Sequence, residues 1–191
     1  MTLLSRRDAL LLALSACVAG VHAAALPGDS IYQLAPALVD QDGRPFELAS
    51  TRGGVVLASM FYSSCEMVCP VLFETIAQTV KALPAAERDR VRIVMVSFDP
   101  ERDTVEVLKD TAQRHGCGPA WTLARGSAAD VRRIAAVLGV QYRRLDSGEF
   151  NHSTQVELLD RDGRIVQRSG RLGEVDPALV QALRREVEAK G

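Results

Sequence analysis

A nearly uninterrupted apolar run at residues 55–62, followed closely by the start of a helix, constrains the fold more than any other stretch of this chain. Strands that are covered on both faces of a parallel sheet are continuously apolar, whereas half-exposed strands alternate. Ser63 and Ser64 end the run, and Pro70 suits the first turn of a helix, where its missing N–H has no partner to lose. A stripe of helical period then follows at Leu72, Phe73, Ile76, Val80 and Leu83. The stretch therefore predicts a buried strand that leads into a helix.

Two cysteines lie in the connection between this strand and this helix. Cys65 follows the strand's carboxyl end, and Cys69 falls at the N-terminus of the helix. Unpaired backbone N–H groups and the positive end of the helix dipole favour the thiolate form there, whereas the charge of Glu66 opposes it. The spacing Cys-x-x-x-Cys is one residue longer than that of thioredoxin-like redox sites, and a structural disulfide is a further interpretation. The motif alone leaves disulfide exchange and metal binding both open.

Length and charge limit the classes of protein to which the chain can belong. At 191 residues, with 47% hydrophobic residues and a net charge of −1, it suits one globular domain. The arginines are scattered among acidic residues and form no basic run, which argues against nucleic acid as a partner. We expect the domain to occupy residues 38–191, after a linker at residues 26–37.

Residues 1–25 have the pattern of an export signal, with a positive region followed by an apolar region and small residues. Residues 14–17 resemble a lipobox, which would make the protein a lipoprotein acylated at Cys17. Cleavage of a signal peptide after Ala23 or Ala25, which would release a soluble protein, and an uncleaved membrane anchor are the alternatives. All three interpretations predict a domain outside the cytoplasm.

Strands and helices alternate along the rest of the chain. We expect a hairpin at residues 38–48, a buried strand at 91–98, a helix up to His115, a short strand at 121–123, a helix from Ser127 to Gly139, a strand at 140–145, a hairpin at 154–168 and a final helix starting at Asp176-Pro177. Strand, helix and strand in succession predict a right-handed parallel crossover. This order predicts an α/β, thioredoxin-like fold with an N-terminal β-hairpin and an additional β-hairpin insertion.

We predict structural roles for the polar residues after the second buried strand. Asp99 is assigned to a turn, Arg102 to the solvated surface, and Asp103 with Glu106 to a capping box at the next helix. Cys117 is the odd cysteine of the domain, and a buried or loop position is assigned to it.

Among the three histidines, His152 is the best candidate for a metal ligand, because it lies in a polar turn just before a strand. Two thiolates and one imidazole form a donor set that copper can use in either oxidation state. Zinc accepts the same donors, but a structural zinc site needs a fourth protein ligand, and the sequence offers no second cysteine or histidine pair. An ordinary turn histidine is the alternative interpretation.

Three motifs together resemble the SCO/SenC family of copper-binding cytochrome c oxidase assembly proteins. They are F-Y-S-S-C-E-M-V-C-P at 61–70, V-S-F-D-P-E-R-D-T at 96–104 and F-N-H-S-T at 150–154. The resemblance covers roughly residues 38–187. It implies a thioredoxin-like domain anchored at the outer, periplasmic face of the inner membrane, with one copper ion held by Cys65, Cys69 and His152.

The resemblance also implies two functions. One is a metallochaperone that delivers copper to the CuA centre of cytochrome c oxidase subunit II, with another periplasmic copper chaperone as a further partner. The other is a thiol-disulfide reductase, in which Cys65 and Cys69 reduce cysteines of that subunit or of other exported proteins. A peroxidase of the same fold would need an activating arginine or glutamine beside Cys65, and the sequence marks none.

The chain departs from the family's frequent Cys-Pro-Asp-x-Cys pattern, because Glu66, Met67 and Val68 separate its two cysteines. The acid is displaced by one position, which puts any role of that aspartate in doubt. The thioether of Met67 is a candidate copper ligand, and a packed or exposed methionine is the alternative.

Overall fold

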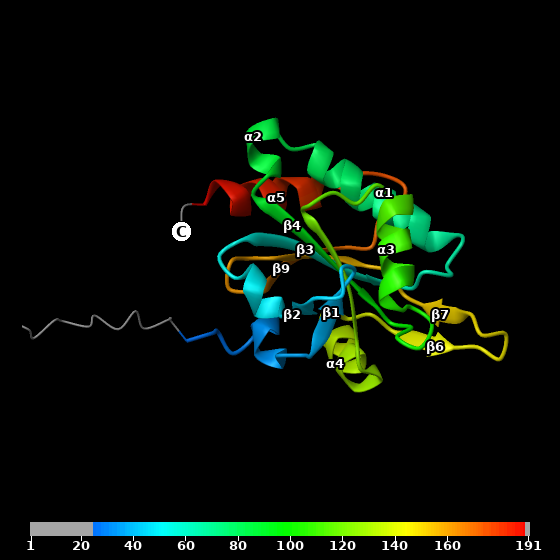
Figure 1. Ribbon diagram of the computed structural model, residues 1–191. Coiled ribbons are helices and arrows are strands. Elements are labelled where there is room, and N and C mark those ends of the chain that lie inside the picture. The colour runs from blue at the N-terminus through cyan, green and yellow to red at the C-terminus, as the bar shows by residue number, and fades with distance from the viewer. Residues whose placement is uncertain (1–24, 190–191) are drawn as a thin grey trace, which may run out of the picture.

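The computed structural model describes residues 25–189, which form a central sheet with helices on both faces (Figure 1). Cys17 and the predicted cleavage site after Ala23 lie outside the described residues. Within the described range, every helix is too short or too polar to cross a bilayer.

Seven strands form the main sheet in the order β2-β1-β5-β4-β3-β8-β9, in which β3, β4 and β5 are parallel. The strands are β1 (Leu38–Asp40), β2 (Pro45–Phe46), β3 (Val55–Phe61), β4 (Val91–Ser97), β5 (Trp121–Gly126), β8 (Val156–Leu159) and β9 (Ile165–Ser169). The predicted N-terminal hairpin is confirmed, and it joins the edge of the main sheet because β1 pairs with β5. This order confirms the predicted thioredoxin-like α/β fold.

Two further strands, β6 (Tyr142–Arg144) and β7 (Phe150–His152), form a separate hairpin. The prediction that His152 lies in a turn before a strand is therefore wrong. Gly148 adopts the left-handed conformation (φ 87°) and lets the chain reverse tightly, so that the polar residues after it pair with β6.

The helices cover the sheet unequally. They are α1 (Val68–Lys81), α2 (Ala85–Arg88), α3 (Val105–Arg114), α4 (Ala128–Leu138) and α5 (Pro177–Glu188), with short 3-10 helices η1 (Ile31–Leu34) and η2 (Leu48–Thr51). Figure 1 shows α4 on the opposite side of the sheet from α1 and α5. The predicted ends of these helices are confirmed: Ser127 accepts from the backbone N–H of Asp130 at 3.1 Å, and Gly139 ends α4 with φ 72°. The helix α5 starts at Pro177, and the side chain of Asp176 caps it.

Part of the predicted linker packs against the domain. Ile31 and Tyr32 in η1 are buried, and the Ile31 N–H donates to the Gly163 carbonyl at 3.0 Å. Gly163 has φ 79°, and a Cβ there would lie 2.7 Å from the Tyr32 ring, so only glycine suits this contact. Residues before β1 therefore contribute to the core.

The predicted capping box at Asp103 is wrong. The Thr104 side chain caps α3 by accepting from the Val107 N–H at 3.4 Å. Asp103 is buried and accepts hydrogen bonds from Ser63 and Ser97 instead. A carboxylate that satisfies donors at the ends of two buried strands leaves fewer polar groups unpaired than a cap on the surface would. The tertiary contact therefore prevails over the local one.

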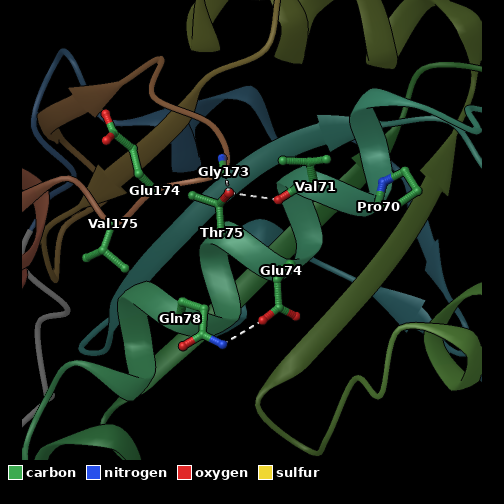
Figure 2. Close-up of a pocket in the computed structure, with 8 residues that line it drawn as sticks. All are labelled: Pro70, Val71, Glu74, Thr75, Gln78, Gly173, Glu174 and Val175. Carbon is green, nitrogen blue, oxygen red and sulfur yellow. Dashed lines mark hydrogen bonds between the residues drawn. The ribbon is translucent and has the colours of Figure 1, made fainter.

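An apolar groove of about 380 Å³ separates α1 from the loop before α5 (Figure 2). Thr75 spans it: its hydroxyl accepts from the Gly173 N–H at 3.0 Å and donates to the Val71 carbonyl at 2.7 Å. The bond to Gly173 ties the loop to the helix that carries Cys69.

We expect Thr75→Val to lower the free energy of unfolding by about 1 kcal/mol, because the Gly173 N–H loses its acceptor. Thr79→Val is the matched control, since the Thr79 hydroxyl donates only to a carbonyl of its own helix. Urea unfolding of both variants measures the difference. Equal losses would show that the bond across the groove contributes nothing.

Candidate metal centre

Cys65, Cys69 and His152 converge at the carboxyl edge of the parallel strands. One donor atom from each lies within 4.8 Å of the other two, and in the described part of the chain this is the only such group of His, Cys, Asp or Glu residues. Cys65 lies in the turn between β3 and α1, and Cys69 is in the first turn of α1, so the strand–helix junction brings the sulfurs together. His152 is the last residue of β7, at the end of the β6–β7 hairpin away from its turn.

The site opens onto a pocket of about 550 Å³, which Cys65 and His152 line. Cys69 lies behind them, with only 3% of its surface exposed. Met67, at the pocket's rim, is 81% exposed, as one of the alternatives for it predicted. An ion held by the three donors would be buried on one side and accessible from the other.

The two thiols differ in acidity, although the sequence predicted that the helix N-terminus would favour the thiolate of both. Burial of Cys65 works to raise its pKa, but hydrogen bonds from the backbone and side chain of Cys69 and from the N–H groups of Val68 and Met67 outweigh burial and lower the pKa. The Cys69 N–H lies 3.3 Å from the Cys65 sulfur. Burial raises the pKa of Cys69 well above its ordinary value. The prediction of two activated thiols is therefore wrong for Cys69, because the helix dipole does not offset its desolvation.

We expect Cys65 to react with iodoacetamide at a lower pH than Cys69 in the reduced, metal-free protein, because alkylation requires the thiolate. Mass spectrometry of peptides after short pulses across a pH series measures the two rates. Cys117 is an internal reference, since burial raises its pKa to about 12. Faster alkylation of Cys69 than of Cys65 would contradict the assignment.

His152 has one ring nitrogen available for a ligand. Its Nδ1 lies 3.1 Å from the Ser153 carbonyl oxygen and 3.3 Å from the Thr154 hydroxyl. A carbonyl only accepts, so a bond to it requires the proton on Nδ1 and leaves the lone pair of Nε2 for a ligand. The ring packs edge-on against Tyr62, with centroids 5.7 Å apart. In proteins, a hydrogen bond from the ring nitrogen that does not bind the metal orients a metal-binding imidazole.

Sequence reasoning missed the residues that join the β6–β7 hairpin to the thiol loop. The Tyr62 hydroxyl donates to Glu149 at 2.8 Å. Arg102, predicted to be a solvated surface charge, pairs with Asp99 and donates to the Gly148 carbonyl at 2.7 Å. The one signal that could have pointed to Arg102 is its place directly after a buried parallel strand, at the edge where α/β sheets gather their sites.

Fold and site together define a thioredoxin-like protein in which two buried thiols and an imidazole beside an open pocket could hold a metal ion. The sequence profile of the SCO1/SenC family matches residues 29–188, and the chain belongs to that family. The resemblance found in the sequence motifs is thus confirmed.

Curated relatives include the SCO2-like protein RP587 of Rickettsia prowazekii, which is 28% identical over 136 residues, or 68% of this chain and 65% of the relative. The SCO1 protein homolog of Bacillus subtilis is 28% identical over 141 residues, which cover 71% of this chain and 72% of the homolog. The match to the Rickettsia protein thus leaves about a third of that relative uncovered.

Solved structures share the fold. ScoI of Bradyrhizobium japonicum, solved with copper bound, is 25% identical with a TM-score of 0.68, and the match covers 79% of this chain and 96% of ScoI. A SCO1/SenC family lipoprotein of Bacillus anthracis is 26% identical with a TM-score of 0.71, covering 80% of this chain and 92% of the lipoprotein.

Proposed function

We propose that this protein is a copper metallochaperone, which binds one copper ion through Cys65, Cys69 and His152 and passes it to a partner. The observation that carries the proposal is the convergence of three soft or borderline donors within 4.8 Å of one another. Membership of the SCO1/SenC family and the copper-bound ScoI structure support it.

The donor set fits reversible binding of copper. The lowered pKa of Cys65 favours its thiolate form, and the ion itself, by its positive charge, would favour deprotonation of Cys69. Three protein ligands at the wall of an open pocket leave a coordination position for a donor of the partner. Copper can then move by ligand exchange, in which one bond to the partner forms as one bond to this protein breaks.

The partner that we propose is subunit II of cytochrome c oxidase, whose CuA centre would receive the copper. Another periplasmic copper chaperone would supply it, and nucleic acid takes no part. We propose that residues 1–25 export the chain and, through Cys17 or the apolar segment, hold it at the periplasmic face of the inner membrane. The Bacillus anthracis relative is described as a lipoprotein, which supports this location.

The different acidities of the two thiols favour a second candidate function, a thiol-disulfide reductase. The Cys65 thiolate would attack one sulfur of a target disulfide, and the other target sulfur would leave as a thiolate. Cys69, after losing its proton, would attack the sulfur of Cys65 and release the second target thiol. Two electrons would thus pass to the target, and the pair would end as a disulfide.

The substitution His152→Ala separates the two functions. We expect it to weaken copper binding by more than the roughly 10- to 100-fold that loss of an outer-shell partner costs, because a direct ligand disappears. The rate of disulfide reduction should change little, since exchange between sulfurs needs no imidazole. Copper affinity comes from competition with a chelator, and the sulfur-to-copper charge-transfer absorption of the copper(II) form reports the site directly.

A matched control is His115→Ala, because this histidine stacks on Phe73 and is not one of the three clustered donors. It should bind copper as the unmodified protein does. Unchanged copper affinity in His152→Ala would remove the imidazole from the site and leave thiol chemistry as the better account.

A further inference from the structure

His152 lies on a hairpin that is not part of the main sheet. β6 and β7 pair only with each other among the described strands. A lone two-stranded hairpin is marginally stable in water. The position of the imidazole relative to the two sulfurs therefore depends on what holds this hairpin against the domain.

Aromatic rings hold the hairpin from one side. Phe98, which follows β4, stacks on Tyr142 of β6 with centroids 5.0 Å apart and contacts Phe150 of β7 at 5.2 Å. Tyr62 contacts Phe150 at 5.1 Å. Apolar packing is non-directional, so these contacts keep the hairpin near the domain and restrict its sliding only weakly.

Arg102 supplies a directional contact at the hairpin's turn. Its Nε pairs with the Asp99 carboxylate, whose side chain is only 3% exposed, and its Nη2 donates to the Gly148 carbonyl at 2.7 Å. The guanidinium also lies 5.7 Å from the centre of the Phe150 ring. Because the donors of a guanidinium diverge in one rigid plane, anchoring at Asp99 sets where the carbonyl of Gly148 must lie.

We propose that Arg102 is a positioning residue, which links Asp99 at the end of β4 to the turn of the β6–β7 hairpin and so keeps His152 within bonding reach of Cys65 and Cys69. This inference rests on the proposed function, because it assumes that His152 is a copper ligand. Arg102 does not touch the ion, and its effect is transmitted through the hairpin backbone.

An ion pair also joins the loop after β4 to the hairpin and provides a control. Arg144 of β6 lies 2.7 Å from Glu101, but both side chains are open to solvent, with exposures of 47% and 75%. Exposed pairs contribute little because water screens them and the side chains lose entropy. Arg144→Ala therefore removes a charged contact of the hairpin without removing its anchor.

The test is Arg102→Lys in the full chain. Lysine keeps the positive charge beside Asp99 but has one nitrogen centre, which cannot serve both Asp99 and the Gly148 carbonyl as the fork does. We expect copper affinity to fall roughly 10-fold, within the range seen for groups that orient metal ligands. Arg144→Ala should change copper affinity by less than about twofold.

A second measurement, hydrogen exchange, needs no copper and complements the copper affinity. In the metal-free protein, Arg102→Lys should speed hydrogen exchange of the amides of residues 150–152, while amides of β3 and β4 keep their protection. Unchanged exchange in the hairpin would overturn the inference. Loss of protection throughout the sheet would overturn it too, because Arg102 would then support the whole fold.

A double substitution shows whether Arg102 acts through the imidazole. In a His152→Ala background, Arg102→Lys should weaken copper binding no further, within about twofold. A full additional loss there would contradict the inference. If His152→Ala weakens binding but Arg102→Lys does not, the inference alone fails, whereas unchanged affinity in His152→Ala overturns the proposed function and the inference together.

Discussion

Oxidation of Cys65 and Cys69 to a disulfide is expected to release copper from the protein, and reduction is expected to restore stoichiometric binding. Two of the three proposed ligands are these sulfurs, and both are free thiols in the structure. Forming the disulfide transfers two electrons to the oxidant and removes both thiolate donors at once. The remaining imidazole would bind copper no better than an ordinary surface histidine, so the oxidised protein should lose nearly all of its copper.

The measurement is the copper content of the protein after gel filtration, before oxidation, after it and after reduction. A Cys17→Ser, Cys117→Ser background leaves only the pair to react. A parallel sample of the same background, taken through every step without oxidant, is the control for copper lost in handling. Stoichiometric copper in the oxidised protein would contradict the assignment of both sulfurs.

Asp103→Ala is expected to lower the free energy of unfolding by about 3 kcal/mol, because several buried donors lose their acceptor. The Asp103 carboxylate accepts from the backbone N–H of Ser63 at 3.1 Å and from the hydroxyls of Ser63 and Ser97. Ser63 lies two residues before Cys65, so these bonds also hold the start of the thiol loop. Urea unfolding measures the loss, and a change below about 1 kcal/mol would show that water replaces these bonds.

The same carboxyl makes stability depend on pH. Burial raises the pKa of Asp103, although hydrogen bonds from Ser63 and Ser97 lower it in part. The folded protein therefore holds this proton more tightly than the unfolded chain does. The part of the stability that comes from this pKa shift is fully present below the pKa of the unfolded chain and is lost as pH rises through the folded pKa.

Asp103→Asn isolates this dependence, because asparagine has a similar shape and does not titrate in that range. We expect the variant to gain stability relative to the unmodified protein as pH rises above the ordinary range of an aspartate, about 4. Unfolding midpoints across a pH series measure the difference. A difference that stays constant, or that shrinks with rising pH, would contradict the raised pKa.

Local patterns predicted those features that depend on neighbours in the sequence. The apolar run at 55–62 predicted a buried strand, and Pro70 with the stripe behind it predicted α1. The cap at Ser127 and the start of a helix at Asp176-Pro177 were predicted for the same reason, since a capping side chain bonds to N–H groups two or three residues away. Such contacts form wherever the segment lies in the fold.

Asp103 and Arg102, whose partners are distant in the sequence, were misassigned. Asp103 satisfied the pattern of a capping box, but Ser63, 40 positions away, offered a buried contact instead. Arg102 looked like a surface charge because its acceptor, the Gly148 carbonyl, lies 46 positions further along the chain. A backbone carbonyl also carries no mark in the sequence that identifies it as a partner.

The amino-acid sequence by itself determined which donor types the chain carries, and that the Cys65–Cys69 pair lies where a buried strand meets a helix. Only the tertiary structure decided that a separate hairpin brings His152 to those sulfurs, and that the pKa of Cys65 is lowered while that of Cys69 is raised. The physical reason is that composition and periodicity report on contacts within a segment. Distances between segments, and the desolvation of a side chain, arise when the layers of the fold pack together.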